Sequence, residues 1–209
     1  MRQKEPATKL IFIRHGQTDF PTDRIYCDNI EDPALNLQGQ QQAQQAAKLL
    51  HGQPIEAIYA SPAKRTLTTA QTIASTLHLP IHERPALRER VFGIWEGLYF
   101  HEIESAYPDE YRQWKTDKSG FKPEGGESIH DLSTRLQAEL QNIINTHAGK
   151  TIAIVSHVGP IRAAVAHAMS MPTEMYRQLR IDYASLSRVD YGKSQNNLIY
   201  LNFSAQLVG

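Results

Sequence analysis

Short apolar runs alternate with amphipathic segments along most of this chain, and that alternation restricts the possible folds more than any other feature. The runs at 9–14, 57–60 and 151–155 have the length and apolar composition of buried strands. Between them, apolar residues recur every three or four positions, as they do on the inner face of a helix. Such alternation is typical of α/β proteins in which helices cover a parallel sheet. We therefore expect an α/β fold with a three-layer, doubly wound and mostly parallel sheet.

Local start signals predict where the helices begin. Ser61 followed by Pro62 is a good helix start, because serine caps the N-terminus and proline suits the first turn. Ser128 with Asp131 three residues later has the spacing of a capping box. Further helices are expected from Gly39 and Gly159, a short extended piece between Pro80 and Pro85, and two late strands at 184–189 and 198–203.

Charge and cysteine content narrow the class of protein. The 22 Lys and Arg residues balance the 22 Asp and Glu residues, so the chain has no overall attraction for nucleic acid or for an anionic membrane. The single cysteine, Cys27, excludes an internal disulfide and fits a reducing compartment. The apolar run at 10–13 is too short for a signal sequence, and nothing reaches the length of a transmembrane span. We expect a soluble, cytoplasmic protein that binds neither nucleic acid nor membrane; a homodimer is compatible with the sequence but not required by it.

Basic residues gather at the expected carboxyl ends of the strands, where open α/β sheets bind their ligands. Arg14 and His15 end the first strand, and Arg65 lies in the first turn of the helix after the second. His157 follows the strand at 151–155. Guanidinium groups bind phosphate oxygens through paired hydrogen bonds, and helix N-termini add backbone donors. The sequence therefore predicts a site for a dianion at this edge of the sheet.

An ordered set of motifs around these residues resembles the histidine phosphatase superfamily, the phosphoglycerate-mutase-like enzymes. The triplet Arg14-His15-Gly16, continued by Gln17-Thr18, is similar to the superfamily signature. The resemblance implies a phosphoglycerate mutase-like fold and a compact phosphatase similar to the α-ribazole-phosphate and broad-specificity phosphatases. Further similar segments follow in family order over most of the chain, at 35–39, 42–43, 61–62, 65–66, 69–70, 87–89, 92–97, 123–128 and 156–157.

The resemblance also implies roles for individual residues in phosphomonoester hydrolysis. His15 would attack phosphorus as a neutral imidazole and carry the phosphoryl group as phosphohistidine, oriented by a backbone acceptor on its other ring nitrogen. Arg14, Arg65 and His157 would bind the nonbridging oxygens. Glu89 would protonate the leaving oxygen and then activate water. The other seven histidines show no metal-ligand spacing, so neither a metal nor another cofactor is expected. The predicted substrate contacts are Arg14, Gln17, Thr18, Arg24, Arg65, His157 and Val158.

The chain departs from the superfamily pattern at two positions. Many members carry a Trp-Asn pair after the signature threonine, whose asparagine reaches the phosphate; here Phe20-Pro21 stand in that place, and proline offers no donor. Arg24 or Asn29 could supply the missing donor, or the pocket could lack it. The second histidine is usually followed by glycine, whereas His157 is followed by valine, with glycine one position later. The resemblance therefore does not predict the local backbone after His157.

Residues 92–121 do not follow the core pattern, because they hold eight of the chain's 17 aromatic residues. We expect 92–127 to form an aromatic-rich insertion near the active site, partly packed as core and partly lining the substrate pocket. It would belong to one histidine phosphatase domain spanning 1–209, in which 1–7 form a loose end. The aromatic content also suggests an apolar or ring-bearing substrate, with Trp95 and Tyr99 as candidate contacts.

Three activities remain open for such a chain. We favour a phosphatase, because mutases of the superfamily are generally longer and enclose a bisphosphorylated intermediate away from water. The alternatives are phosphoglycerate mutase, an isomerase that uses the same histidine, and a phosphate-binding module without catalysis. Phosphate release from p-nitrophenyl phosphate, compared with conversion of 3-phosphoglycerate into 2-phosphoglycerate, separates the first two. The presence of both His15 and Glu89 argues against the third, since binding alone needs neither a nucleophile nor a proton donor.

Overall fold

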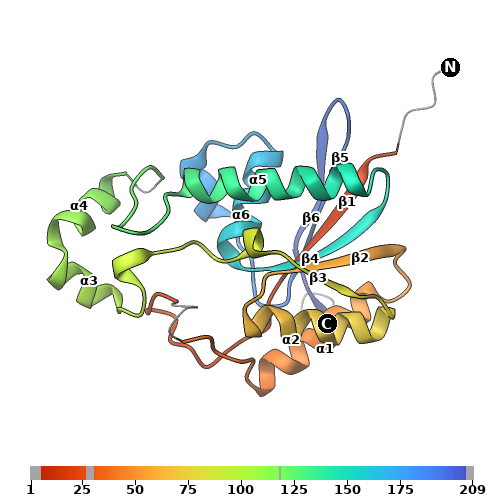
Figure 1. Ribbon diagram of the computed structural model, residues 1–209, viewed down its shortest axis with the longest axis horizontal. Coiled ribbons are helices and arrows are strands. Elements are labelled where there is room, and N and C mark those ends of the chain that lie inside the picture. Colours follow the sequence, from red (N-terminus) through yellow and green to blue (C-terminus); the bar gives the residue numbers. More distant parts are fainter. Residues whose placement is uncertain (1–5, 27–30, 118, 206–209) are drawn as a thin grey trace.

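The computed structural model describes residues 6–26, 31–117 and 119–205, so Cys27 and Asn29 lie outside the described part of the chain. The strands are β1 (Thr8–Arg14), β2 (Ile55–Ala60), β3 (Ile81–Glu83), β4 (Thr151–Ser156), β5 (Leu186–Tyr191) and β6 (Asn196–Phe203). They form one six-stranded sheet in the order β3-β2-β4-β1-β5-β6 (Figure 1). Neighbours from β3 to β1 are parallel, whereas β5 is antiparallel to both β1 and β6. The sheet is therefore mixed, with the parallel part at the strands that carry the predicted basic residues.

Helices cover both faces of the sheet, which confirms the expected layered α/β architecture (Figure 1). Helices α1 (Leu37–Leu50) and α2 (Lys64–Leu77) lie on one face, and α5 (Ile129–Thr146) and α6 (Val158–Ala168) lie on the other. Successive side chains of β1 point to opposite faces of the sheet and so contribute to two separate hydrophobic cores. Leu10 and Phe12 join the α5 and α6 side, while Ile11 and Ile13 join the α1 and α2 side. All six residues of β4 are buried, as expected of a strand covered on both faces.

Two of the predicted helix starts differ in outcome. Helix α5 begins as expected: Ser128 accepts a hydrogen bond from the Asp131 amide, and Asp131 accepts one from the Ser128 amide. Helix α2 does not begin at Ser61, because its N-cap is Ala63, which makes no side-chain capping bond. The Ser61 hydroxyl is instead committed to a tertiary contact with a histidine from another strand end. The prediction of Ser61 as a cap was therefore wrong.

The aromatic segment forms a structure of its own beyond the carboxyl edge of the sheet (Figure 1). It contains a 3₁₀ turn η2 (Gly93–Trp95) and the short helices α3 (Phe100–Ala106) and α4 (Pro108–Thr116). Its own small core is centred on Trp95, Ile103 and Phe121, with Ile25 from the loop after β1 packed among them. Two other 3₁₀ turns are η1 (Pro85–Leu87), which contacts α5, and η3 (Thr173–Gln178), which contacts α6. None of the helices in the described ranges is long and apolar enough to cross a lipid bilayer.

Candidate active site

The two predicted histidines come together because β1 and β4 are adjacent and parallel. Arg14 pairs in register with Ser156, and the His15 amide donates to the Ser156 carbonyl at 3.0 Å. The two strands therefore end at the same level of the sheet, and the ring centres of His15 and His157 lie 5.3 Å apart. Both histidines are buried, with 2% of His15 and 0% of His157 exposed. The pairing of β1 with β4 thus places two imidazoles from distant parts of the sequence side by side in a buried position.

His15 is held as a neutral ring with one defined free nitrogen. Its Nδ1 lies 2.7 Å from the Gly16 carbonyl oxygen, which can only accept, so Nδ1 carries the proton and Nε2 keeps its lone pair. Burial lowers the pKa of His15 well below its ordinary value, and the nearby charges of Arg65 and Arg14 lower it further. The Gly16 carbonyl is thus the backbone acceptor that the resemblance to the superfamily implied. Gly16 is required here, because a Cβ on it would collide with the backbone of Gly39.

Arg65 and His157 form a buried pair with Ser61. The Arg65 Nη2 donates to Nδ1 of His157 at 3.1 Å, so the proton on His157 sits on Nε2 and is donated to Ser61 Oγ at 2.8 Å. Burial, followed by the charge of Arg65, lowers the pKa of His157 well below its ordinary value. Arg65 is fully buried and also lies 3.5 Å from an oxygen of Asp32. Sequence reasoning missed Ser61, because Ser-Pro looks locally like a helix start.

Two tyrosines that the sequence did not single out lie against the basic residues. The Arg65 guanidinium carbon is 4.2 Å from the ring centre of Tyr26, and that of Arg14 is 3.8 Å from Tyr183. The Tyr26 hydroxyl lies 3.0 Å from the Thr18 hydroxyl, and burial raises the pKa of Tyr26. These contacts depend on loops far apart in sequence, so no local signal could have identified them.

Phe20-Pro21, which replace the Trp-Asn pair of many superfamily members, lie in a loop that positions Tyr26 near Arg65. The Phe20 ring stacks on Tyr26 with their centres 4.3 Å apart, so the loop brings a tyrosine toward Arg65. Arg24, one of the two suggested substitutes for the missing donor, is tied to the Gly97 carbonyl at 2.7 Å and to Glu31 at 2.9 Å. The other suggestion, Asn29, lies outside the described residues.

Glu89 is fixed by two backbone amides, that of its neighbour Arg90 and one at the start of α6. Its Oε1 accepts from the Arg90 amide at 2.8 Å, and its Oε2 accepts from the Gly159 amide at 3.2 Å. A Cβ on Gly159 would collide with Oε1, so the glycine that is shifted by one position makes room for this carboxylate. The unusual valine is simply the first residue of α6, with His157 as its N-cap. The backbone after His157 therefore enters α6 directly.

Arg135 on α5 organises the segment that carries Glu89, and sequence reasoning missed it. Its Nε and Nη2 bind the two carboxylate oxygens of Glu127 at 2.7 and 2.8 Å. The same guanidinium donates to the carbonyls of Ala86, Arg88 and Glu89 at 2.7, 3.1 and 3.0 Å. A helical arginine usually counts as a surface residue, so only the tertiary structure shows that five hydrogen bonds converge on it.

A pocket of about 370 Å³ opens beside these residues. Arg14, Glu89, Arg24 and Val158 line it, so four of the predicted site residues share one cavity. Thr18 is buried beneath Tyr26, and the Gln17 amide is bonded to Gln42, which makes these two part of the support around His15. The aromatic segment contributes Phe92, Trp95, Phe100 and Trp114 to the lining, whereas Tyr99 is not part of it.

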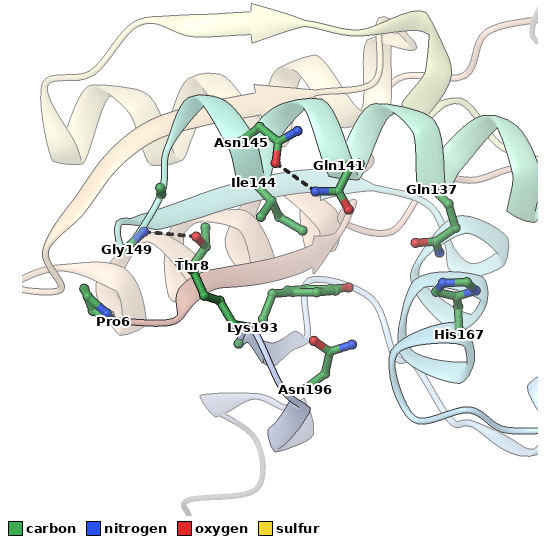
Figure 2. Close-up of a pocket in the computed structure, with 13 residues that line it drawn as sticks. Pro6, Thr8, Gln137, Gln141, Ile144, Asn145, Gly149, His167, Lys193 and Asn196 are labelled. Atoms are coloured by element: carbon green, nitrogen blue, oxygen red, sulfur yellow. Dashed lines mark hydrogen bonds between the residues drawn. The ribbon is translucent and has the colours of Figure 1, made fainter. Parts of the chain in front are cut away.

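A second pocket, of about 430 Å³, lies at the opposite end of β1 (Figure 2). Its walls include Thr8, Gln141 and Asn196, and it contains none of the predicted site residues. Figure 2 shows Gln137 and His167 facing the same space from two helices. Ligands of parallel α/β sheets bind at the carboxyl ends of the strands, so the smaller pocket is the candidate active site. Among the described residues, no cluster of three or more His, Cys, Asp or Glu side chains is arranged to hold a metal ion.

Comparison with known proteins supplies relatives that match nearly the whole chain. The family model of the histidine phosphatase superfamily, branch 1, matches residues 10–204. Phosphoserine phosphatase 1 of Hydrogenobacter thermophilus is 29% identical over 200 residues, which are 95% of this chain and 94% of that protein. A probable phosphoglycerate mutase, GpmB, of Yersinia enterocolitica is 32% identical over 191 residues, 89% of this chain and 86% of that protein.

The same comparison in three dimensions gives a matching fold. The crystal structure of the alpha-ribazole phosphatase from Shigella flexneri has a TM-score of 0.85 at 28% identity, covering 93% of this chain and 96% of that one. The phosphoglycerate mutase-like architecture expected from the motifs is thus confirmed. Some mycobacterial relatives are longer, and the match spans 50% of their length.

Proposed function

The chain belongs to the histidine phosphatase superfamily and is a phosphomonoester hydrolase, and we propose that it works through a phosphohistidine formed on His15. One observation carries this proposal: His15 is a buried, neutral imidazole whose Nδ1–H is held by the Gly16 carbonyl. Such a ring can attack phosphorus only through Nε2. The charges of Arg14 and Arg65 beside it favour a dianionic substrate. The proposed substrate is a small phosphorylated metabolite, and the proposed reaction needs no metal ion.

The proposed reaction has two steps. In the first, Nε2 of His15 forms a bond to phosphorus while the bond from phosphorus to the leaving oxygen breaks, and Glu89, which enters the step as the carboxylic acid, gives its proton to that oxygen. In the second, Glu89 takes a proton from water, whose oxygen attacks phosphorus and releases His15 and inorganic phosphate. The position of Glu89 in the wall that also contains Arg14 supports this role. Its two backbone hydrogen bonds, from Arg90 and Gly159, keep the carboxylate in one orientation.

Charge stabilisation has to supply most of the acceleration. Hydrolysis of phosphate monoesters is among the slowest uncatalysed reactions, and enzymes accelerate such reactions up to ~10²¹-fold. Proton transfer by one side chain contributes only roughly 10²–10⁴-fold. Arg14 and Arg65 are therefore proposed to bind the equatorial oxygens as charge moves onto them. Arg65 is oriented in advance by His157 and shielded from water by complete burial, which strengthens its electrostatic effect.

His157 is proposed to act through Arg65 as well as on the substrate. Both of its ring nitrogens are engaged, one by Arg65 and one by Ser61. The only donor on the His157 ring is Nε2–H, which is bonded to the Ser61 hydroxyl. Contact between His157 and a phosphate oxygen therefore requires that Nε2–H leave that hydroxyl. In the absence of substrate Ser61 would therefore accept the hydrogen bond from Nε2–H of His157, and on binding that N–H would donate to the anion instead.

The nucleophile can be tested with a matched histidine pair. His15→Ala should abolish turnover of p-nitrophenyl phosphate while leaving vanadate binding measurable. His167→Ala is the control, because His167 is an exposed histidine near the end of α6, in the pocket at the other end of β1. Rapid quenching of the wild type under alkaline conditions should trap a base-stable phosphoryl group that the His15 variant lacks. Near-normal turnover by His15→Ala would refute the covalent route.

Phosphoglycerate mutase is the second candidate, because one relative at 32% identity carries that name. A mutase would use the same histidine but would return the phosphoryl group to the product. The two activities are separated by measuring phosphate release and formation of 2-phosphoglycerate from 3-phosphoglycerate in the same assay. Isomerisation faster than phosphate release would reverse the assignment.

A further inference from the structure

The pocket beside the proposed phosphoryl site has more positive charge than a phosphate monoester requires. Its charged lining residues are five arginines and one acid: Arg14, Arg24, Arg90, Arg162, Arg177 and Glu89. Arg14 is assigned to the phosphoryl group in the mechanism above, and Arg24 has its own partner in Glu31. Three guanidinium groups are then left for the part of the substrate that departs with the leaving oxygen.

These three arginines come from separate segments and are held without carboxylate partners. Within the described ranges, none of Arg90, Arg162 and Arg177 forms an ion pair with an acidic side chain, whereas Arg135 and Arg188 both do. Arg90 donates to the carbonyls of Glu127 and Phe121 at 2.6 and 3.0 Å. An arginine held by neutral carbonyls keeps its full charge available to a ligand.

The environment of each guanidinium also favours an incoming anion. Arg90 is 4% exposed, and its Nη1 is buried without a hydrogen-bond partner in the described structure. Arg162 is anchored by one bond to the Leu179 carbonyl at 2.7 Å, and Arg177 lies 5.1 Å from the Trp114 ring. Burial lowers the pKa of Arg90 and of Arg162, and the charge of Arg177 adds to this in both cases. Mutual repulsion in a partly buried site is relieved by binding a negative group.

Apolar side chains line the same pocket as this cluster. Phe92, Phe100 and Trp114 line the same cavity, and Arg90 lies 4.8 Å from the Phe92 ring. Phe100 and Trp114 stack with their ring centres 6.0 Å apart, so they offer an apolar surface in the same cavity as the guanidinium groups. Planar guanidinium groups bind carboxylates through paired hydrogen bonds.

We infer that Arg90, Arg162 and Arg177 form a subsite for a second anionic group, so that the substrate is a phosphomonoester whose leaving alcohol carries a carboxylate on an apolar or ring-bearing body. This inference rests on the proposed function, because the subsite is defined by its position beside the phosphoryl group. The subsite does not take part in bond breaking; it sets which ester is bound.

The test uses two esters of nearly equal shape and different charge, 4-carboxyphenyl phosphate and 4-carbamoylphenyl phosphate. In the wild type, kcat/KM should favour the carboxylate by at least about tenfold, as expected of a charge-assisted hydrogen bond. Arg177→Gln should remove most of that preference through KM and leave the neutral ester almost unchanged. Arg162→Gln should act in the same direction. Dividing each variant's ratio by that of the wild type cancels the difference in reactivity between the two phenols.

Arg180→Gln is the matched control, because Arg180 lies three residues from Arg177, is 81% exposed and does not line the pocket. Its ratio should equal that of the wild type. Hydrolysis of both esters at a ratio that neither Arg177→Gln nor Arg162→Gln alters would overturn the subsite alone. Failure of the wild type to hydrolyse even the neutral ester would overturn the proposed function and the subsite with it.

Discussion

Adding one methyl group at Gly159 should separate catalysis from stability. In Gly159→Ala the new Cβ occupies the space of Glu89 Oε1, so the carboxylate has to move or rotate away. A displacement of about 1 Å at a reacting group can cost about 10²-fold in rate. The backbone itself tolerates alanine, since Gly159 lies in the first turn of α6, where alanine is favoured over glycine by up to about 1 kcal/mol.

The stability of this variant should therefore stay close to that of the wild type. Loss of the 3.2 Å bond from the Gly159 amide to Glu89 costs about 1 kcal/mol, which offsets the gain in helix propensity. We expect kcat for phenyl phosphate to fall about 10²-fold while the thermal midpoint moves by no more than a few degrees.

The assay compares Gly159→Ala, Glu89→Gln and the double variant. If Gly159 matters only through Glu89, the methyl group should have almost no further effect on kcat once Glu89 is already changed. A full additional loss in the double variant would show that the methyl group damages something else. An unchanged kcat in Gly159→Ala, with the fold intact, would refute the fixed position of Glu89 as the basis of its role.

Three further predictions concern pH, metal ions and the pocket wall. The pKa values of His15 and His157 are depressed in the folded state, so their contribution to stability is present above pH about 6.5 and is lost as pH falls below that value. Urea midpoints at pH 7.5 and 5.5 should differ less in His157→Asn than in the wild type, whereas His167→Asn should behave as the wild type. Dialysis against EDTA should leave turnover unchanged; a loss that a divalent ion restores would mean that a metal takes part. Trp114→Ala should alter the ranking of a panel of phosphoesters, since Trp114 lines the pocket, and Tyr99→Ala should alter it far less.

The parts of the structure that follow from local periodicity were predictable from the sequence. Continuous apolar runs give buried strands, and parallel strands bring their carboxyl ends to one edge, which is why Arg14, His15 and His157 could be placed together. The direction of β5 was not predicted, although its short connection to β6 contains Gly192, a residue typical of hairpin turns.

What could not be predicted depends on contacts between distant segments. Ser61 satisfies every local rule for a helix cap, yet its hydroxyl binds His157, because tertiary geometry overrides a capping preference worth about 1 kcal/mol. Tyr26 and Tyr183 come from irregular loops whose course no periodicity describes. Within the aromatic segment, composition alone does not distinguish Trp114, which lines the pocket, from Tyr99, which does not.

Because catalysis requires β1 to pair with β4, the return of activity during refolding should report when these two strands dock. Phe12 on β1 faces Ile154 on β4, so well over half of the chain separates two strands that must dock before His15 and His157 can meet. Such long-range contacts form slowly, because closing a long loop costs entropy before any contact rewards it. A refolding chain can therefore regain its helices while remaining inert, and turnover should return only when these two central strands join.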